Sequence, residues 1–152
     1  MGWMKGNIDE LDRQVLQKML EGKGVGARLT QLANELGIPR STANLRVTKL
    51  EERGVISRYV PRIDWKKLGY EFFGFIGIAC PTNALNTLIT RLKDEEIVSD
   101  IWDVTTGTFR ILLQCRFRSY EDLRRLYDLI MEVPGIRDVE VWLLGKSYKD
   151  ES

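Results

Sequence analysis

Polar and cationic side chains gather on one face of the stretch between Pro39 and Gly54. When this stretch is projected as a helix, at about 100° per residue, its apolar residues fall on the opposite face. Hydroxyl, amide and cationic groups bind phosphates and the edges of base pairs, so this face has the chemistry of a DNA contact. The residues expected in that role are Arg40, Ser41, Thr42, Asn44, Leu45, Arg46, Thr48, Lys49 and Arg53.

The arginines in and after this stretch are expected to act mainly on phosphates. Arg46 has a second option, because it can also serve as an internal salt-bridge partner. Arg58 follows the helix in a segment, residues 55–63, whose alternating pattern predicts a strand ended by Pro61. From there Arg58 can reach a flanking phosphate or remain a solvated charge. A solvated amphipathic helix would have a similar pattern, so the neighbouring sequence has to support the DNA interpretation.

The neighbouring sequence supplies a second helix and a turn. Ala43, Val47 and Leu50 form an apolar stripe at i, i+4 and i+7, which predicts that the 40–53 helix packs on a core. A shorter apolar stripe lies between residues 29 and 36, and Gly37 follows it as a C-cap. Two short amphipathic helices joined by a glycine-containing turn predict a helix-turn-helix, whose second helix, the recognition helix, docks in the major groove.

An earlier helix completes a three-helix unit. Apolar residues repeat with helical spacing between positions 8 and 20. Asn7 is the predicted N-cap of this helix, and the acidic residues Asp9, Glu10 and Asp12 occupy its first turn.

Composition allows one domain or two small ones and separates two charge regions. The chain has 152 residues, 43% of them apolar, and a formal net charge of +1. That net charge alone argues against a nucleic-acid-binding protein. Residues 1–63, however, hold 11 Lys/Arg against 7 Asp/Glu, whereas residues 64–152 hold 12 against 15. The asymmetry predicts that the N-terminal part approaches phosphate and that the remainder has another task.

The C-terminal part alternates between strand and helix periods in the order β-α-β-β-α-β. This order predicts a ferredoxin-like domain, in which two helices cover one face of a four-stranded antiparallel sheet. A capping box of Ser119 and Asp122 is expected to start the second helix. The predicted strands are residues 71–80, 98–104, 109–117 and 136–144, and the helices begin near Thr82 or Asn83 and after Ser119.

The overall expectation is an α+β protein with a winged-helix-like helix-turn-helix domain followed by the ferredoxin-like domain. The predicted bounds are residues 1–60 for the DNA-binding domain, 61–69 for a connector and 70–152 for the second domain. Both faces of the predicted sheet carry apolar residues, including Trp102 and Trp142. Since the helices cover only one face, we expect the other face to be covered by a second copy of the chain in a symmetric homodimer.

Other features exclude several classes of protein. No apolar run approaches the roughly 20 residues of a membrane span, and residues 1–7 lack the apolar region of a signal peptide, so we expect a cytoplasmic protein without a membrane partner. Cys80 and Cys115 lie in apolar strand-like runs and are expected to be buried thiols, with no metal site and no cofactor. The chain contains no histidine. General acid–base catalysis at neutral pH would need another group, and we expect no enzyme.

Taken together, these motifs resemble the Lrp/AsnC (feast/famine) family of transcriptional regulators over nearly the whole chain. The resemblance rests on IDELDRQVLQKML at 8–20, LTQLANELGIPRSTANLRVTKLEERGVI at 29–56, DWKKLGY at 64–70 and VTTGTFRILL at 104–113. It implies a regulator that binds double-stranded DNA as a dimer. It also implies a C-terminal domain used for dimerisation, for assembly into tetramers or octamers and for sensing a small-molecule effector, such as an amino acid.

The resemblance has departures at three positions. Pro39 stands where the family often has a capping serine, and it supplies no side-chain oxygen to the helix. Leu45 replaces an often polar or basic residue, and we hypothesise that it meets a thymine methyl group. Arg110 stands where the family has an aspartate that takes an effector's ammonium group. Arg110 leaves three options open: the protein has no effector, its effector is an acidic or non-amino ligand, or Arg110 has a role in assembly. The implied effector-binding residues are Thr105, Thr106, Gly107, Thr108, Phe109 and Arg110.

Three other functions compete with DNA regulation. Siroheme decarboxylases have a similar two-domain architecture, and that resemblance would imply catalytic histidines in the ferredoxin-like domain. This chain contains no histidine. RNA binding by the sheet would need a pattern of aromatic, basic and small residues on the third strand. Only Phe109 and Phe117 are candidates there, and core or interface packing explains them better. The third alternative is a metabolite-sensing module that does not bind DNA. The net positive charge of the N-terminal region argues against it.

Overall fold

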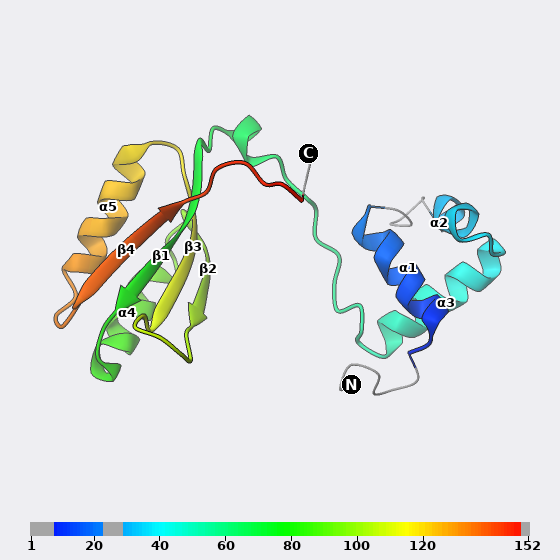
Figure 1. The fold of residues 1–152 in the computed structure, drawn as a ribbon, viewed down its shortest axis with the longest axis horizontal. Helices are drawn as coiled ribbons and strands as arrows, with labels where there is room; N and C mark the ends of the chain where they lie inside the picture. The colour runs from blue at the N-terminus through cyan, green and yellow to red at the C-terminus, as the bar shows by residue number, and fades with distance from the viewer. Residues whose placement is uncertain (1–7, 23–28, 150–152) are drawn as a thin grey trace. The chain divides into compact units, whose positions relative to one another are not determined.

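The computed structural model describes residues 8–22 and 29–149, which belong to two compact units, Met1–Arg62 and Ile63–Ser152 (Figure 1). The N-terminal unit contains three helices, α1 (Glu10–Leu20), α2 (Leu29–Leu36) and α3 (Arg40–Glu52). Their apolar stripes meet in one core, as the helical spacing predicts. Its buried residues are Val15, Leu32, Ala33, Ala43, Val47 and Leu50.

The start of α1 corrects one prediction. Asp9, and not Asn7, is the N-cap of this helix; Asn7 lies outside the described residues. The Asp12 backbone N–H donates to Oδ1 of Asp9 at 2.9 Å, and the Asp9 backbone N–H donates to Oδ2 of Asp12 at 3.2 Å. Two carboxylates therefore cap the helix reciprocally and complement the positive end of its dipole.

Glycines close the turns at both ends of α3. Gly37 has a φ of 64°, and the following Ile38 N–H donates to the Ala33 carbonyl at 3.0 Å, which ends α2 as predicted. Pro39 is the N-cap of α3 and makes no side-chain capping bond. Gly54, with a φ of 71°, follows α3, and the Val55 N–H donates back to the Leu50 carbonyl at 2.9 Å. These turns fix the length of the recognition helix.

The strand predicted for residues 55–63 is wrong, because this segment forms no strand. Alternation predicts a strand only when a neighbouring strand can complete the backbone hydrogen bonds. The three-helix unit offers no strand among its described residues, and Val55, Tyr59 and Val60 are all exposed. Partial burial, followed by the nearby charge of Glu51 of α3, instead raises the pKa of Tyr59, so the tyrosine side chain is in contact with that helix. Arg58 therefore lies in an irregular segment beside that contact.

The C-terminal unit is the predicted ferredoxin-like domain. Its antiparallel sheet has the order β2-β3-β1-β4. Helices α4 and α5 lie on the same side of the sheet (Figure 1). Strand ends differ from the predicted ones by one or two residues at most positions. The elements are β1 (Phe72–Ala79), a short 3-10 helix (Thr82–Ala84), α4 (Leu85–Leu92), β2 (Val98–Asp103), β3 (Ile111–Phe117), α5 (Tyr120–Met131) and β4 (Asp138–Leu143).

The core of this unit lies between the sheet and the two helices. Ile76 and Ile78 of β1 are fully buried there, together with Leu113 of β3, Leu88 of α4 and Leu126 of α5. Cys80 and Cys115 are buried free thiols, as predicted. No helix in residues 8–22 or 29–149 combines the length and apolar character needed to cross a membrane.

The start of α5 departs from the predicted capping box. Ser119 is at the N-cap position but makes no side-chain capping bond. The carboxylate of Asp122 instead accepts from the Arg118 backbone N–H at 3.0 Å and from Arg118 Nε at 3.2 Å. Burial of the carboxyl group opposes ionisation, but these bonds and the charge of Arg118 outweigh it and lower the pKa of Asp122.

Replacing Asp122 with asparagine is therefore expected to destabilise the protein near neutral pH by about 1 kcal/mol. Because the folded-state pKa lies below the unfolded value near 3.9, the carboxylate stabilises the fold fully above about pH 4. That contribution is lost as the pH falls through the lower folded-state value. Thermal melts of wild type and Asp122→Asn should converge at low pH, whereas Asp94→Asn, which changes an exposed carboxylate in a turn, should match wild type throughout. A pH-independent difference would contradict this explanation.

Candidate nucleic-acid interface

The outer face of α3 presents most of the predicted DNA-contacting residues to solvent. Thr42 is half-buried, whereas the other polar residues of the first turns are exposed, and the Leu45 side chain is 51% exposed despite its apolar character. This arrangement follows from the core stripe, which directs every fourth residue inward. The exposed members of the predicted set are Arg40, Ser41, Asn44, Leu45, Thr48, Lys49 and Arg53, and Arg58 is exposed in the following segment.

A concave surface lies beside this face, between α3 and the start of α1. Leu45, Lys49 and Arg53 of α3 contribute to its lining, together with Asp12 of α1. Cationic groups at the rim of a concavity are suited to a phosphate, since their charges converge on one point. The structure thus brings Lys49 and Arg53 together on the side of α3 that faces α1.

Arg46 lines the same surface, but its guanidinium is paired within the unit. Nη1 donates to Oδ2 of Asp9 and lies 3.6 Å from Oδ1 of Asp12. Of the two roles that the sequence leaves open for Arg46, the structure shows the salt bridge. The hydrogen bond from the Asp12 backbone N–H, followed by the bond from Arg46, lowers the pKa of Asp9. The sequence left an internal salt bridge open for Arg46 and placed Asp9 and Asp12 in the first turn of α1, but it did not identify them as the partners.

The sheet face opposite α4 and α5, here called the open face, carries large apolar side chains. Trp102 is 54% exposed, and Trp142 is 37% exposed. A Cβ added at Gly77 would lie 2.8 Å from Cη2 of Trp142 and 3.0 Å from Cγ of Phe109, so glycine makes room for both rings. These two rings pack edge to face, with centroids 5.5 Å apart. By strand register, Phe73, Phe75, Trp102, Leu112 and Trp142 lie on this face. We include Phe109 in the open face because its ring packs on Trp142.

The connector packs against one end of this face through a contact that the sequence did not predict. The Arg116 guanidinium of β3 lies 3.8 Å from the ring centroid of Trp65, which belongs to a short 3-10 helix, Trp65–Leu68. Trp65 also packs edge to face on Tyr70, whose hydroxyl donates to Glu96 at 3.0 Å. Cation–π stacking therefore holds the connector on the sheet. The sequence signal was weak, because the two residues are far apart along the chain.

The predicted effector residues form the loop between β2 and β3. Thr105, Thr106, Gly107 and Thr108 are exposed, and Gly107 turns the chain with a φ of 92°. Phe109 instead packs on Trp142 of the open face. The loop therefore offers backbone groups to solvent and ends on an anchored aromatic ring.

Arg110 closes this loop. Its backbone N–H donates to the Ile78 carbonyl at 2.9 Å, which fixes the residue at the end of the sheet. Its Nη2 lies 3.7 Å from Oδ1 of Asp103, and the two side chains are 40% and 65% exposed, so the pair is weak. Arg110 Nε is buried and finds no hydrogen-bond partner within residues 8–22 and 29–149. This cation thus retains unused capacity to donate hydrogen bonds.

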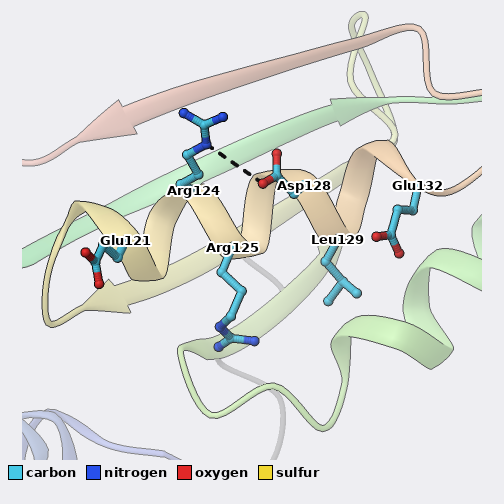
Figure 2. Close-up of a pocket in the computed structure, with 6 residues that line it drawn as sticks. All are labelled: Glu121, Arg124, Arg125, Asp128, Leu129 and Glu132. Atoms are coloured by element: carbon cyan, nitrogen blue, oxygen red, sulfur yellow. Dashed lines mark ion pairs between the residues drawn. The ribbon is translucent and has the colours of Figure 1, made fainter.

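A depression on the outer face of α5 is a different kind of surface. Figure 2 shows its charged residues projecting from one helix, with Arg124 paired to Asp128 at 3.9 Å. Arg125 pairs with Glu95 at 3.0 Å, and Glu132 pairs with Arg91 at 2.9 Å. Because acidic and basic groups already pair, the depression is a solvated helix face rather than a site for a charged ligand.

The thiols and acidic groups give no sign of other chemistry. Burial raises the pKa of Cys115 to about 12 and also raises that of Cys80, although the charges of Arg110 and Arg137 oppose the effect at Cys80. Both thiols are therefore protonated at neutral pH and poorly nucleophilic. In the described part of the chain, no cluster of His, Cys, Asp or Glu has the makings of a metal site.

Comparisons with known proteins cover both units. Residues 74–152 match the family model described as the Lrp/AsnC ligand-binding domain, and residues 8–57 match one described as winged helix-turn-helix DNA-binding. An uncharacterized HTH-type transcriptional regulator of Pyrococcus furiosus is 31% identical over 144 residues, 95% of this chain and 95% of the relative. The HTH-type transcriptional regulator FL11 of Pyrococcus horikoshii is 27% identical and covers 97% of this chain and 95% of its own length.

Solved structures show the same two-domain architecture. Escherichia coli AsnC matches with a TM-score of 0.75 and 26% identity, covering 97% of this chain and 98% of AsnC. A transcriptional regulator of Neisseria meningitidis, solved as a complex with L-Met, matches with a TM-score of 0.80 and covers 95% of this chain and 94% of its own. At 19% identity, that second likeness shows the fold alone.

Proposed function

We propose that this chain, which belongs to the Lrp/AsnC family of transcriptional regulators, reads its DNA sites through the outer face of α3. The observation that carries the proposal is the separation of the two faces of this helix. Ala43, Val47 and Leu50 are buried, and the hydrogen-bonding side chains of the same helix are exposed. A helix of this kind following a glycine turn presents its N-terminal turns to base edges in the major groove.

Within this proposal the contacts divide by chemistry. Ser41, Thr42, Asn44, Leu45 and Thr48 contact base edges, where Leu45 meets a thymine methyl group. Lys49 belongs to the same base-contacting set, since a lysine ammonium can donate to the O6 and N7 atoms of guanine. Arg40, Arg53 and Arg58 bind phosphates, which position the protein without carrying sequence information.

Fluorescence anisotropy with labelled duplex DNA at several salt concentrations tests this function. Each phosphate contact should contribute about −0.9 to the slope of log K against log salt concentration. Binding that weakens steeply with salt, and is stronger for one sequence than for others, supports the proposal. Absence of DNA binding at low salt, or binding that is insensitive to salt, overturns it.

We further propose that the protein is a homodimer joined through the open face. The support is the exposure of Trp102 and Trp142 on the sheet face opposite α4 and α5. Two identical faces packed about a two-fold axis would bury these rings and join two DNA-binding units in one molecule, as binding to paired half-sites requires. Tetramers and octamers built from such dimers are the larger assemblies compatible with this arrangement.

For the effector, we propose a small molecule with an anionic group, bound at the 105–110 loop with Arg110 as its partner. The support is the weak pairing of Arg110 with Asp103, which leaves the Arg110 side chain 40% exposed. A cation here disfavours the ammonium group of an ordinary amino acid and favours a carboxylate.

A thermal-shift screen tests the choice of effector. A dicarboxylate present at about 100 times its Kd should raise the melting temperature by about 5–10 °C, because binding to the native state adds about 2.7 kcal/mol of stability. The shift should disappear in Arg110→Met. Equal shifts with neutral amino acids, or a shift that survives in Arg110→Met, would contradict the assignment.

We propose no catalytic activity for this chain. The support is the absence of histidine, the side chain whose ordinary pKa lies closest to neutral, and the raised pKa of both thiols, which keeps them protonated. A protein that regulates transcription acts where the chromosome is, and we place it in the cytoplasm.

A further inference from the structure

Four carboxylate oxygens at the start of α1 are all engaged. Oδ1 of Asp9 and Oδ2 of Asp12 accept the two backbone N–H groups of the capping box, at 2.9 and 3.2 Å. The two remaining oxygens, Oδ2 of Asp9 and Oδ1 of Asp12, face the same atom, Nη1 of Arg46. The guanidinium of Arg46 in α3 is therefore held by both capping residues of α1. We call this group of Asp9, Asp12 and Arg46 the clamp.

The burial of these groups makes the arrangement costly to break. The side chain of Asp12 is 7% exposed, that of Arg46 is 30% exposed and that of Asp9 is 52% exposed. If Arg46 moved away to bind a phosphate, a nearly buried carboxylate would lose its cation. In addition, two carboxylates face one guanidinium, so Arg46 adds no net positive charge to this side of α3.

The position of Arg46 on α3 gives the clamp a consequence for DNA recognition. Arg46 follows Leu45 and lies near Lys49 and Arg53 on the surface that faces α1. The core residues of α3 fix its distance from α1, but apolar packing tolerates small rotations and slides. A directional ion pair between the helices limits the rotation of α3 about its own axis, and hence the direction in which Asn44, Leu45 and Thr48 project.

From this geometry we infer that Arg46 is a positioning residue that locks the recognition helix to the cap of α1, and not a phosphate contact. The inference rests on the proposed DNA-binding function and refines it. Disorienting the base-contacting face reduces the ratio of specific to non-specific affinity. Loss of a phosphate contact would instead weaken binding to all sequences and reduce the salt dependence.

Three variants separate these two roles. Asp9→Asn keeps a good N-cap residue but removes one charge of the clamp. Arg46→Met keeps the unbranched stem and removes the cation. The double variant measures their coupling. Glu10→Gln is the matched control, because Glu10 is also acidic and in the first turn but pairs with Arg13 at 3.3 Å rather than with Arg46.

Anisotropy is measured for a duplex that wild type binds specifically and for a shuffled duplex, at temperatures at which circular dichroism shows each variant folded. We expect Asp9→Asn and Arg46→Met each to lower the specific-to-shuffled affinity ratio by about tenfold. The salt slope should be unchanged, and the double variant should be no worse than Arg46→Met. Glu10→Gln should keep the wild-type ratio.

The opposite results overturn the inference. Arg46 is a phosphate contact if the slope of log K against log salt concentration falls by about 0.9 per recognition helix in Arg46→Met and if Asp9→Asn binds DNA more tightly than wild type. An unchanged affinity ratio in folded variants with lowered melting temperatures identifies a purely structural ion pair. If Arg46→Met does not fold, Asp9→Asn alone decides by the same ratio. Failure of wild type to bind DNA would instead overturn the proposed function, and the two failures are therefore distinguishable.

Discussion

Replacing Trp102 with aspartate is expected to convert the protein into a monomer and to weaken its binding to a duplex with two half-sites by about 100-fold or more. Trp102 is 54% exposed on the open face and makes no ring-to-ring contact among those described in the chain. The substitution therefore leaves the fold of one copy largely intact. In a dimer, however, it would place an unpaired carboxylate between two apolar sheets.

Light scattering after gel filtration measures the first effect, and anisotropy measures the second. Tyr127→Asp is the matched control, since Tyr127 is an exposed aromatic residue, 39% accessible, in α5 on the other side of the sheet, and it too is in none of the described ring pairs. The control should remain dimeric and bind normally. A dimeric Trp102→Asp protein with wild-type affinity would show that the copies associate through another surface.

Replacing Asn44 with alanine is expected to cost about 1–3 kcal/mol of binding free energy in each half-site, which is about 5- to 150-fold in affinity. Asparagine can donate to and accept from one adenine edge at once, and alanine does neither. Asn44 is exposed on α3, so its truncation leaves the core of the unit unchanged. The loss should be confined to one base pair per half-site and should vanish when that base pair is already mutated.

Arg40→Gln provides the comparison for Asn44→Ala. Loss of the proposed phosphate contact at Arg40 would weaken binding to all duplexes and lower the salt slope by about 0.9 per half-site. Parallel titrations of both variants against a set of single-base operator mutants separate the two patterns. A uniform loss for Asn44→Ala across that set would mean that Asn44 does not read a base.

Periodicity was sufficient to predict most of the fold. The buried positions Ala43, Val47 and Leu50 followed from helical spacing, and the order of strands and helices predicted the sheet topology. The strand expected at residues 55–63 failed for a physical reason. Alternation describes a backbone that could pair, but it does not reveal whether another strand lies within hydrogen-bonding distance.

Contacts between distant residues were the part that sequence could not supply. Arg46 and Asp9 are 37 residues apart, and nothing in their local patterns connects them. The spacing of Asp9 and Asp12 is that of a capping box, which could have identified the true N-cap. The stacking of Trp65 on Arg116 likewise depends on tertiary structure. By contrast, the exposure of most polar residues of α3 was predictable from the sequence, because the apolar stripe of the same helix lies on the face that packs on the core.

Selection of bound duplexes from a random pool, followed by sequencing, tests the central claim most directly. The account predicts one enriched motif made of two inverted half-sites whose centres are about one helical turn, 10–10.5 base pairs, or a multiple of it apart. Enrichment of a single unrepeated half-site, or of no sequence at all, would contradict a paired recognition helix.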